Sequence, residues 1–179
     1  VLAPMLYSSN AEYNYVMDSD FVANLEKELA AQGIHILDTH YSFGFRSVVT
    51  NLDVKTPEDL KGHVLRATSS ALFTKTLECL GATANPMSFT ECLSAISSGV
   101  VEGFEGSVST LAGAGNPYEL VKKVAETNHL IATRWLFISE DCWNTIPEKY
   151  QKIIEDCAYE CGMWEQTSCE DDEATQIES

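Results

Sequence analysis

The stretch KTPEDLKGHVLRATSS, residues 55–70, contains signals for a helical turn and for the strand that follows it. Thr56 can N-cap the turn, Pro57 has the fixed φ that suits a first helical position, and Asp59 lies three residues after Thr56 as in a short capping box. The next segment, HVLRAT, has the composition of a strand, and Arg66 stands near its end. The stretch therefore predicts a short helix, then a strand that carries a cation at its carboxyl end.

The same alternation continues on both sides of this stretch. Strands that alternate with helices at this spacing predict βαβ units and a mostly parallel sheet, whose ligands sit beyond the carboxyl ends of the strands. The last predicted helix is too long for one small domain, since about 30 residues span about 45 Å. Helices are expected over 8–33, 70–80, 88–99, 117–128, just after Ser139 and over 147–177; strands are expected over 63–68, 100–107 and 129–139, with two short strands in 34–51 and a plain connection over 81–86.

Composition limits the classes of function. The chain has 179 residues, 45% of them hydrophobic, which is enough for one domain or two small lobes. Its formal net charge of −16 disfavours non-specific binding to nucleic acids or anionic membranes. Apolar runs such as WLFI, residues 135–138, are far too short to cross a bilayer. An anionic ligand therefore requires a local cationic pocket.

No pattern predicts a metal site, a cofactor site or catalysis. The six cysteines form no CxxC pair, and buried thiols are the simplest interpretation. The four histidines lack the helical i, i+4 spacing of a metal pair, and GxSxG, P-loop and GxGxxG motifs are absent. Glu102 and Glu105 could form an acid/base pair, but no nucleophile accompanies them. We therefore expect no enzyme, no metal and no cofactor.

Two arginines and three aromatic residues are candidate ligand contacts. The planar fork of Arg66 matches a carboxylate, and the alternative is a salt bridge to one of the 27 acidic residues. Arg134 lies within a predicted strand, where it either contacts a ligand or forms a buried ion pair. Phe89, Phe104 and Trp135 either line a pocket or belong to the core.

Four segments together resemble a known family. VKTPEDLKGHVLRAT (54–68), LGATANPMSFTECLSAISSGVVEGFEGS (80–107), YELVKKVAETNHL (118–130) and LFISEDCWNTIPEKYQKIIEDCA (136–158) are similar, in order and spacing, to solute-binding proteins of TRAP transporters of the dicarboxylate-receptor (DctP) type. The resemblance implies an α/β, two-lobed periplasmic binding protein fold (type II-like), incomplete here, with a long C-terminal helix between the lobes. It also implies an exported periplasmic receptor, its signal peptide removed, that delivers a small organic acid to a TRAP membrane permease.

The resemblance also implies roles for individual residues. Arg66 matches the arginine that pairs with the substrate carboxylate, and Ser69 follows it in the same strand-end loop. Phe89 matches an aromatic residue that lines the cleft. The segment Phe104–Ser107, with Glu105, matches a ligand-contacting loop, although FEGS replaces the usual QENP. Leu52 stands where one branch has an arginine, so we expect an apolar pocket for an aromatic or branched monocarboxylate. Arg134 and Trp135 lie on the strand that returns between the lobes.

The resemblance assigns residues 1–48 and 132–170 to lobe one, and 49–131 and 171–179 to lobe two. Because family members are longer, we expect either a fragment of a longer protein or a homodimer or strand-exchanged assembly formed through exposed sheet edges. Two alternative functions share these features. One is a sensor module of the same fold, and the other is a truncated fragment that does not bind ligand.

Overall fold

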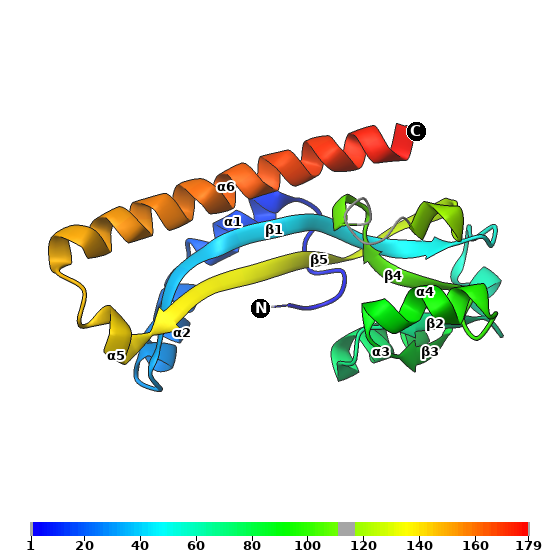
Figure 1. Ribbon diagram of the computed structural model, residues 1–179, viewed down its shortest axis with the longest axis horizontal. Coiled ribbons are helices and arrows are strands. Elements are labelled where there is room, and N and C mark those ends of the chain that lie inside the picture. Colours follow the sequence, from blue (N-terminus) through cyan, green and yellow to red (C-terminus); the bar gives the residue numbers. More distant parts are fainter. Residues whose placement is uncertain (1, 111–116, 179) are drawn as a thin grey trace. The chain divides into compact units, whose positions relative to one another are not determined.

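The computed structural model describes residues 2–110 and 117–178, and Figure 1 shows the order of its elements. The chain divides into two compact units. Unit 1 comprises Val1–Leu6, Phe45–Ile131 and Gln176–Ser179, and unit 2 comprises Tyr7–Gly44 and Ala132–Thr175. Strands β1 (Ile34–Thr50) and β5 (Lys123–Ser139) each contribute residues to both units.

The strands form one five-stranded sheet in the order β3-β2-β4-β1-β5. In unit 1, β2 (Val64–Ala67) pairs in parallel with β3 (Thr83–Pro86) and with β4 (Gly103–Ser107), whereas β4 pairs antiparallel with β1. The parallel pairing predicted from the sequence is therefore confirmed for β2 and β4, and β3, which was not predicted as a strand, pairs in parallel as well. As a result, the carboxyl ends of these three strands lie at the same edge of the sheet.

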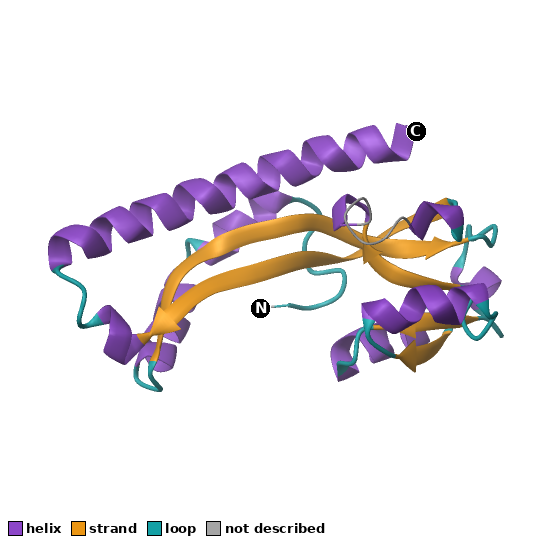
Figure 2. Cartoon of the chain, viewed as in Figure 1, coloured by secondary structure: helices purple, strands orange, loops and turns teal. Residues whose placement is uncertain are grey.

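The helices of unit 1 begin at the predicted caps (Figure 2). The one-turn 3₁₀ helix η1 (Pro57–Leu60) has the Thr56/Asp59 capping box, and α4 (Phe89–Ser97) has the box formed by Ser88 and Glu91. In each box a carboxylate accepts from the cap residue's backbone N–H, at 2.8 and 3.1 Å respectively. The remaining helical segments of this unit are α3 (Ala71–Cys79), η2 (Val108–Thr110) and η3 (Pro117–Glu119).

Two hydrophobic clusters cover opposite faces of the unit 1 sheet. Neighbouring residues of a strand point to opposite faces, so Val48 and Val49 of β1 enter different clusters. The first cluster includes Leu77 of α3, and the second includes Cys92 of α4. The other buried members are Leu60, Leu65, Ala67 and Ala82 in the first cluster, and Phe104, Val108 and Val121 in the second. Each helix therefore buries its apolar side on a different face.

Unit 2 contains α1 (Asn10–Met17), α2 (Asp20–Ala30), α5 (Glu140–Trp143) and most of α6 (Glu148–Glu178), whose residues from Gln176 onward fall in unit 1. The long C-terminal helix is confirmed, with 31 residues, and Ser139 caps α5 as predicted by accepting from the backbone N–H of Cys142. Asn14 of α1 and Gln166 of α6 exchange two side-chain hydrogen bonds, of 3.0 and 2.9 Å. These bonds tie α1 to α6.

Four local predictions are wrong. The single helix expected over 8–33 is two helices, α1 and α2. The break lies at Ser19, which has an extended backbone and is the N-cap residue of α2. The two short strands expected in 34–51 are one strand, which continues through Gly44 at φ 78°. The connection expected over 81–86 contains β3, and the helix expected over 117–128 is a 3₁₀ turn followed by the first part of β5. In the last two cases an available sheet neighbour outweighs weak local propensity.

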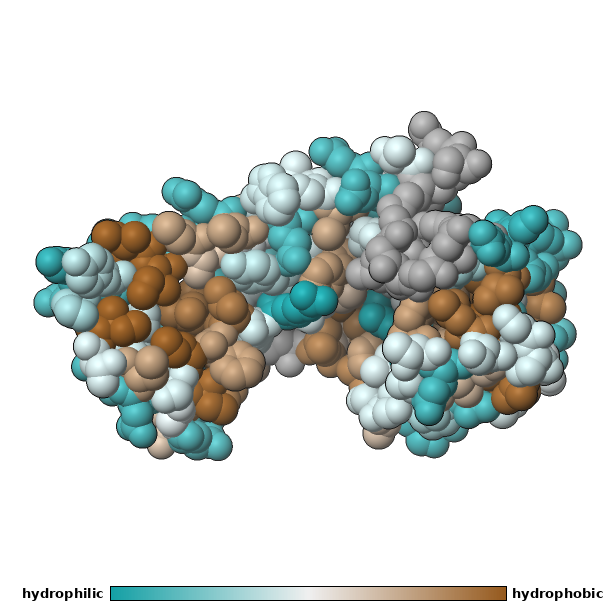
Figure 3. Space-filling view, viewed as in Figure 1, coloured by the Kyte–Doolittle hydropathy of each residue, from teal (hydrophilic) through white to brown (hydrophobic). Residues whose placement is uncertain are grey.

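Within the described residues, no helix is both long and apolar enough to cross a membrane. On the face shown in Figure 3, hydrophobic side chains gather over the end of unit 2 that carries α2 and α5. Phe21 of α2 is 65% exposed and Phe137 of β5 is 62% exposed. All six cysteines are free thiols, but the expectation that they are buried is wrong for five of them, since Cys92 alone among the six is buried.

Candidate functional site

Arg66 is held at the carboxyl end of β2 in unit 1, with only 6% of its surface exposed. Its Nε donates a hydrogen bond of 2.9 Å to the backbone carbonyl of Met87, which follows β3. Its guanidinium carbon lies 5.6 Å from the ring centre of Phe89, the first residue of α4. Phe89 in turn packs edge-to-face on Phe104, with 5.4 Å between ring centres. The carboxyl end of β2 thus places Arg66 beside the aromatic rings of Phe89 and Phe104.

The charge of Arg66 is not neutralised within the described part of unit 1. Arg66 forms no ion pair with any described residue, so the salt bridge considered from the sequence is not found. Burial lowers the pKa of Arg66, but a guanidinium remains charged at physiological pH. Burial also raises the pKa of the neighbouring Cys92 thiol to about 11, so Cys92 supplies no counter-charge. No described residue accepts from the terminal nitrogens of Arg66, which can therefore donate to an anion.

A second arginine on the other face of the sheet is fully paired. Arg46 of β1 binds Glu105 of β4 in bidentate fashion, with Nε–Oε2 at 2.6 Å and Nη2–Oε1 at 2.8 Å. Its guanidinium carbon also lies 4.7 Å from the ring centre of Phe73. The Thr68 hydroxyl donates to Glu105 at 3.3 Å, and His129 Nε2 lies 3.6 Å from Oε2 of Glu105.

The environment of Glu105 keeps it ionised. The side chain is 1% exposed, and burial alone would raise the pKa of its carboxyl group. The neighbouring His129 and Arg46 outweigh this effect and hold the pKa of Glu105 below its usual value. Glu105 is thus a permanent anion at neutral pH, committed to Arg46.

The structure brings together some of the residues singled out from the sequence. Phe89 contacts both Arg66 and Phe104, whereas Glu105 points to the opposite face of β4 from Phe104. Phe104 is completely buried, and its edge-to-face contact holds the ring of Phe89 in place. Ser69 is exposed in the loop between β2 and α3.

The two candidates on β5 belong to unit 2. Arg134 is exposed, and its guanidinium carbon stacks 3.8 Å from the ring centre of Phe43. The buried ion pair considered for Arg134 is not found, because its position is exposed. Trp135 donates from Nε1 to the Tyr13 hydroxyl at 3.3 Å, and that hydroxyl donates to the Thr39 carbonyl at 2.6 Å. Trp135 is thereby fixed in orientation.

Three contributors were not identified from the sequence: the carbonyl of Met87, the hydroxyl of Thr68, and His129. A backbone carbonyl carries no sequence signal, and a single threonine or histidine has no periodicity.

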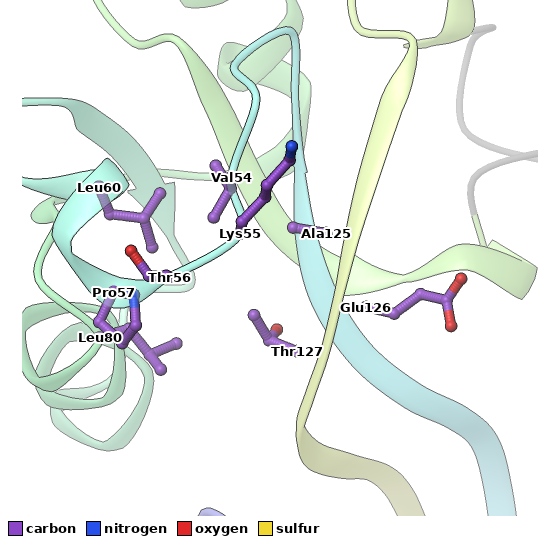
Figure 4. Close-up of a pocket in the computed structure, with 9 residues that line it drawn as sticks. All are labelled: Val54, Lys55, Thr56, Pro57, Leu60, Leu80, Ala125, Glu126 and Thr127. Carbon is purple, nitrogen blue, oxygen red and sulfur yellow. The ribbon is translucent and has the colours of Figure 1, made fainter.

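The structure also contains a hollow of about 210 Å³ in unit 1 that does not involve Arg66. Figure 4 shows Val54, Leu60 and Leu80 on one side of it and Ala125 and Thr127 on the other, while the Glu126 carboxylate points away.

Comparison with known families identifies the chain. The DctP family, described as "Bacterial extracellular solute-binding protein, family 7", matches residues 2–179. The chain belongs to this family. The resemblance seen in the sequence and the predicted α/β fold of TRAP solute-binding proteins are thereby confirmed.

Curated relatives of this family 7 protein include a solute-binding protein of Sulfitobacter sp., 28% identical over 161 residues that cover 90% of this chain and 48% of the relative. The sialic acid-binding periplasmic protein SiaP of Vibrio cholerae is 27% identical over 163 residues, which are 90% of this chain and 50% of SiaP. The chain thus spans about half the length of these curated relatives.

Solved structures of the family align with almost all of this chain. A TRAP periplasmic solute-binding protein of Desulfovibrio salexigens, in complex with diglycerolphosphate, is 39% identical with a TM-score of 0.91. The alignment covers 99% of this chain and 57% of that one. A Fusobacterium protein with bound sn-glycerol-3-phosphate is 32% identical with a TM-score of 0.89, and the alignment again covers 99% and 57% of the two chains. A Sulfitobacter protein with bound beta-D-galacturonate is 27% identical with a TM-score of 0.86, over 98% of this chain and 58% of that one.

Proposed function

We propose that this chain provides the ligand-binding part of a periplasmic receptor that binds a small organic acid and delivers it to a TRAP membrane permease. The observation that carries the proposal is Arg66, a buried guanidinium that, among the residues the structure describes, has no ion pair and no hydrogen-bond partner for its terminal nitrogens. A buried cation without a counter-ion is costly, and a carboxylate ligand supplies the missing partner.

The proposed contacts follow from the geometry of unit 1. The ligand carboxylate accepts two parallel hydrogen bonds from Arg66, while the bond from Nε to Met87 fixes the plane of the guanidinium. Phe89 covers the apolar part of the ligand, Phe104 supports Phe89, and the exposed Ser69 hydroxyl contacts the ligand's polar groups. Glu105 acts on the site through Arg46.

In unit 2, Arg134 and Trp135 remain proposed ligand contacts. The guanidinium of Arg134 is solvent-accessible, and Trp135 is held by Tyr13. An aromatic or branched monocarboxylate stays the predicted type of acid. The homodimer also stays a prediction, to be checked by sedimentation velocity of the purified chain.

A phosphate ester is the second candidate ligand. The relatives that are 39% and 32% identical are described with diglycerolphosphate and sn-glycerol-3-phosphate, respectively. An arginine fork matches phosphate oxygens as well as it matches a carboxylate. Other relatives are named for sialic acid or described with galacturonate, and these acids support a carboxylate as the ligand instead.

Isothermal titration calorimetry of the purified chain tests the proposal. We expect saturable, one-to-one binding of at least one member of a panel of hydroxy acids, aromatic acids, branched acids and phosphate esters. The recovered ligand should be chemically unchanged, because the family binds solutes. Absence of binding across the panel, with the protein folded by circular dichroism, would contradict the receptor function. Cell fractionation of the source bacterium checks the periplasmic location.

A further inference from the structure

Helix α6 carries an exposed row of apolar side chains and thiols in unit 2. The helix packs within the unit through a different side, which includes the buried Ala158 and Gln166. Trp164 is 71% exposed and Ile153 is 56% exposed, although tryptophan is among the more buried residue types. The row, called the α6 stripe below, comprises Tyr150, Ile153, Cys157, Cys161 and Trp164, all of them exposed. A contiguous exposed apolar surface of this kind is typical of a contact site.

The spacing of the α6 stripe is symmetric about Cys157. Its steps along the sequence are three, four, four and three residues. Eleven residues are close to three turns of an undistorted helix, so the stripe stays on one side of α6 over about 21 Å. Because the steps are the same from either end, a second α6 that runs in the opposite direction meets the stripe in register. Tyr150 then lies opposite Trp164 of the second copy, Ile153 lies opposite its Cys161, and the two Cys157 residues meet.

The charges of α6 favour this antiparallel arrangement. Lys149 and Lys152, its basic residues, lie near its start, whereas its later turns carry Glu160, Glu165 and the acidic run Glu170–Glu173. Antiparallel copies place the basic start of each helix beside the acidic part of the other. Along the axis, Lys152 then lies within about 3 Å of the level of Glu160 of the second copy. Parallel copies would instead set acidic turns beside acidic turns, which repel each other.

We infer that the α6 stripe is a self-association surface: two copies of this chain pair their α6 helices antiparallel about a twofold axis at Cys157. Each copy contributes the same residues, so the interface is isologous. This surface differs from the exposed sheet edges, and the pairing does not depend on ligand binding at Arg66. One helix face per copy is a small interface, so the dimer should dissociate on dilution.

The thiol at the twofold axis allows a test at the level of single residues. Helix axes about 8–10 Å apart, with Cα atoms about 2.3 Å from each axis, bring facing Cα atoms to about 3.5–5.5 Å. A disulfide needs about 4.4–6.8 Å, so the two Cys157 thiols can be joined. The two Cys161 residues stand four positions beyond the axis on opposite sides, and about 12 Å along the helices separates them. They cannot be joined.

Diamide, an azo compound, supplies the oxidation: the S–S bond forms while the N=N bond takes up the two thiol protons and two electrons. One variant keeps Cys157 and has serine in place of four other cysteines, Cys79, Cys142, Cys161 and Cys169. The matched variant keeps Cys161 and carries Cys157→Ser instead. On non-reducing gels we expect a dimer from the first variant, reversed by dithiothreitol, and at least about tenfold less dimer from the second. Equal dimer in both variants, or none in the first, overturns the proposed pairing.

Sedimentation velocity of the reduced wild-type chain measures the association without a cross-link. We expect the mass to rise with concentration toward twice that of one chain. Ile153→Glu places an unpaired carboxylate in both halves of the interface, so the Kd of the dimer should rise at least about 30-fold. Phe21→Glu is the matched control, because Phe21 is 65% exposed but lies on α2, outside the stripe. It should change this Kd by less than about twofold.

Charge reversal tests the direction of the helices. Lys152 is exposed, and its contact with Asp156 at 3.0 Å within α6 is a surface ion pair of little weight. Lys152→Glu should raise the Kd of the dimer about threefold or more, and Lys152→Glu/Glu160→Lys should restore it. A double variant that dimerises no better than the single variant contradicts the antiparallel register.

The outcomes separate this inference from the proposed function. A wild-type chain that stays monomeric at every concentration but binds an acid in calorimetry refutes the α6 pairing and leaves the receptor function intact. A dimer that Ile153→Glu leaves unchanged, with the variant folded by circular dichroism, assigns self-association to another surface, such as the sheet edges, and also overturns the inference. A dimer lost in Ile153→Glu and kept in Phe21→Glu supports it.

Discussion

Replacing Arg66 with lysine keeps the positive charge but removes the planar fork. In the structure, Arg66 donates from Nε to the Met87 carbonyl, and no described residue accepts from its two terminal nitrogens, which we propose bind the ligand. A lysine ammonium is a single group that must serve both the Met87 carbonyl and the ligand. We therefore expect the loss of one charge-assisted hydrogen bond to the ligand, which is worth about 1.5–3 kcal/mol. This corresponds to an increase in Kd of about 10- to 150-fold.

The assay is calorimetric titration of the wild-type chain and the Arg66→Lys variant with the tightest ligand of the panel. Urea unfolding of both proteins, and of Arg134→Lys as a conservative variant at an exposed arginine, controls for folding. We expect the free energy of unfolding of Arg66→Lys to fall by about 1 kcal/mol, since one neutral-acceptor hydrogen bond is weakened. An affinity within about twofold of wild type, in a folded variant, would refute the role of Arg66 as the carboxylate fork.

Three further predictions concern the framework around the site. Gly103→Ala in β4 should lower the free energy of unfolding by about 2 kcal/mol or more, because the new Cβ would lie 2.8 Å from a side-chain carbon of β1 and still closer to a β1 carbonyl. Gly106→Ala in the same strand meets only ring carbons at 3.4 Å and beyond, so an equal loss in both variants, measured by urea unfolding, would contradict this steric argument. Asn128 has φ 43°, so Asn128→Ala should cost about 1–2 kcal/mol in thermal unfolding, whereas Asn128→Gly, which tolerates this backbone, should cost less. In unit 2, hydrogen bonding to Asp38 is the main cause that raises the pKa of His40, and nearby Asp18 adds to it. The stabilisation by His40 should therefore be complete below about pH 6.5 and lost as the pH rises through the raised pKa, and His40→Gln should remove this component of the pH dependence of Tm. A variant with the same pH profile as wild type would exclude His40 as the source.

The elements with strong local signals could be predicted from the sequence. The capping boxes at Thr56 and Ser88 each fix a helix start through hydrogen bonds between residues three positions apart, so distant contacts are not needed to define them. The long helix after Pro147 follows from a run without proline and with one glycine, and the structure confirms it. Arg66 could likewise be placed at a strand end from local pattern alone.

Tertiary structure decided the features that depend on distant partners. The sequence predicts a helix before Asn128, but pairing in the sheet makes the segment from Lys123 a strand, because ladder hydrogen bonds outweigh weak propensity. The sequence also does not show which of the two arginines, Arg46 or Arg66, has an acidic partner. Arg46 meets Glu105 only because β1 and β4 are paired, and this leaves Arg66 without an acidic partner in the described unit. Which cation is neutralised is a matter of distance across strands, and one-dimensional spacing does not contain that distance.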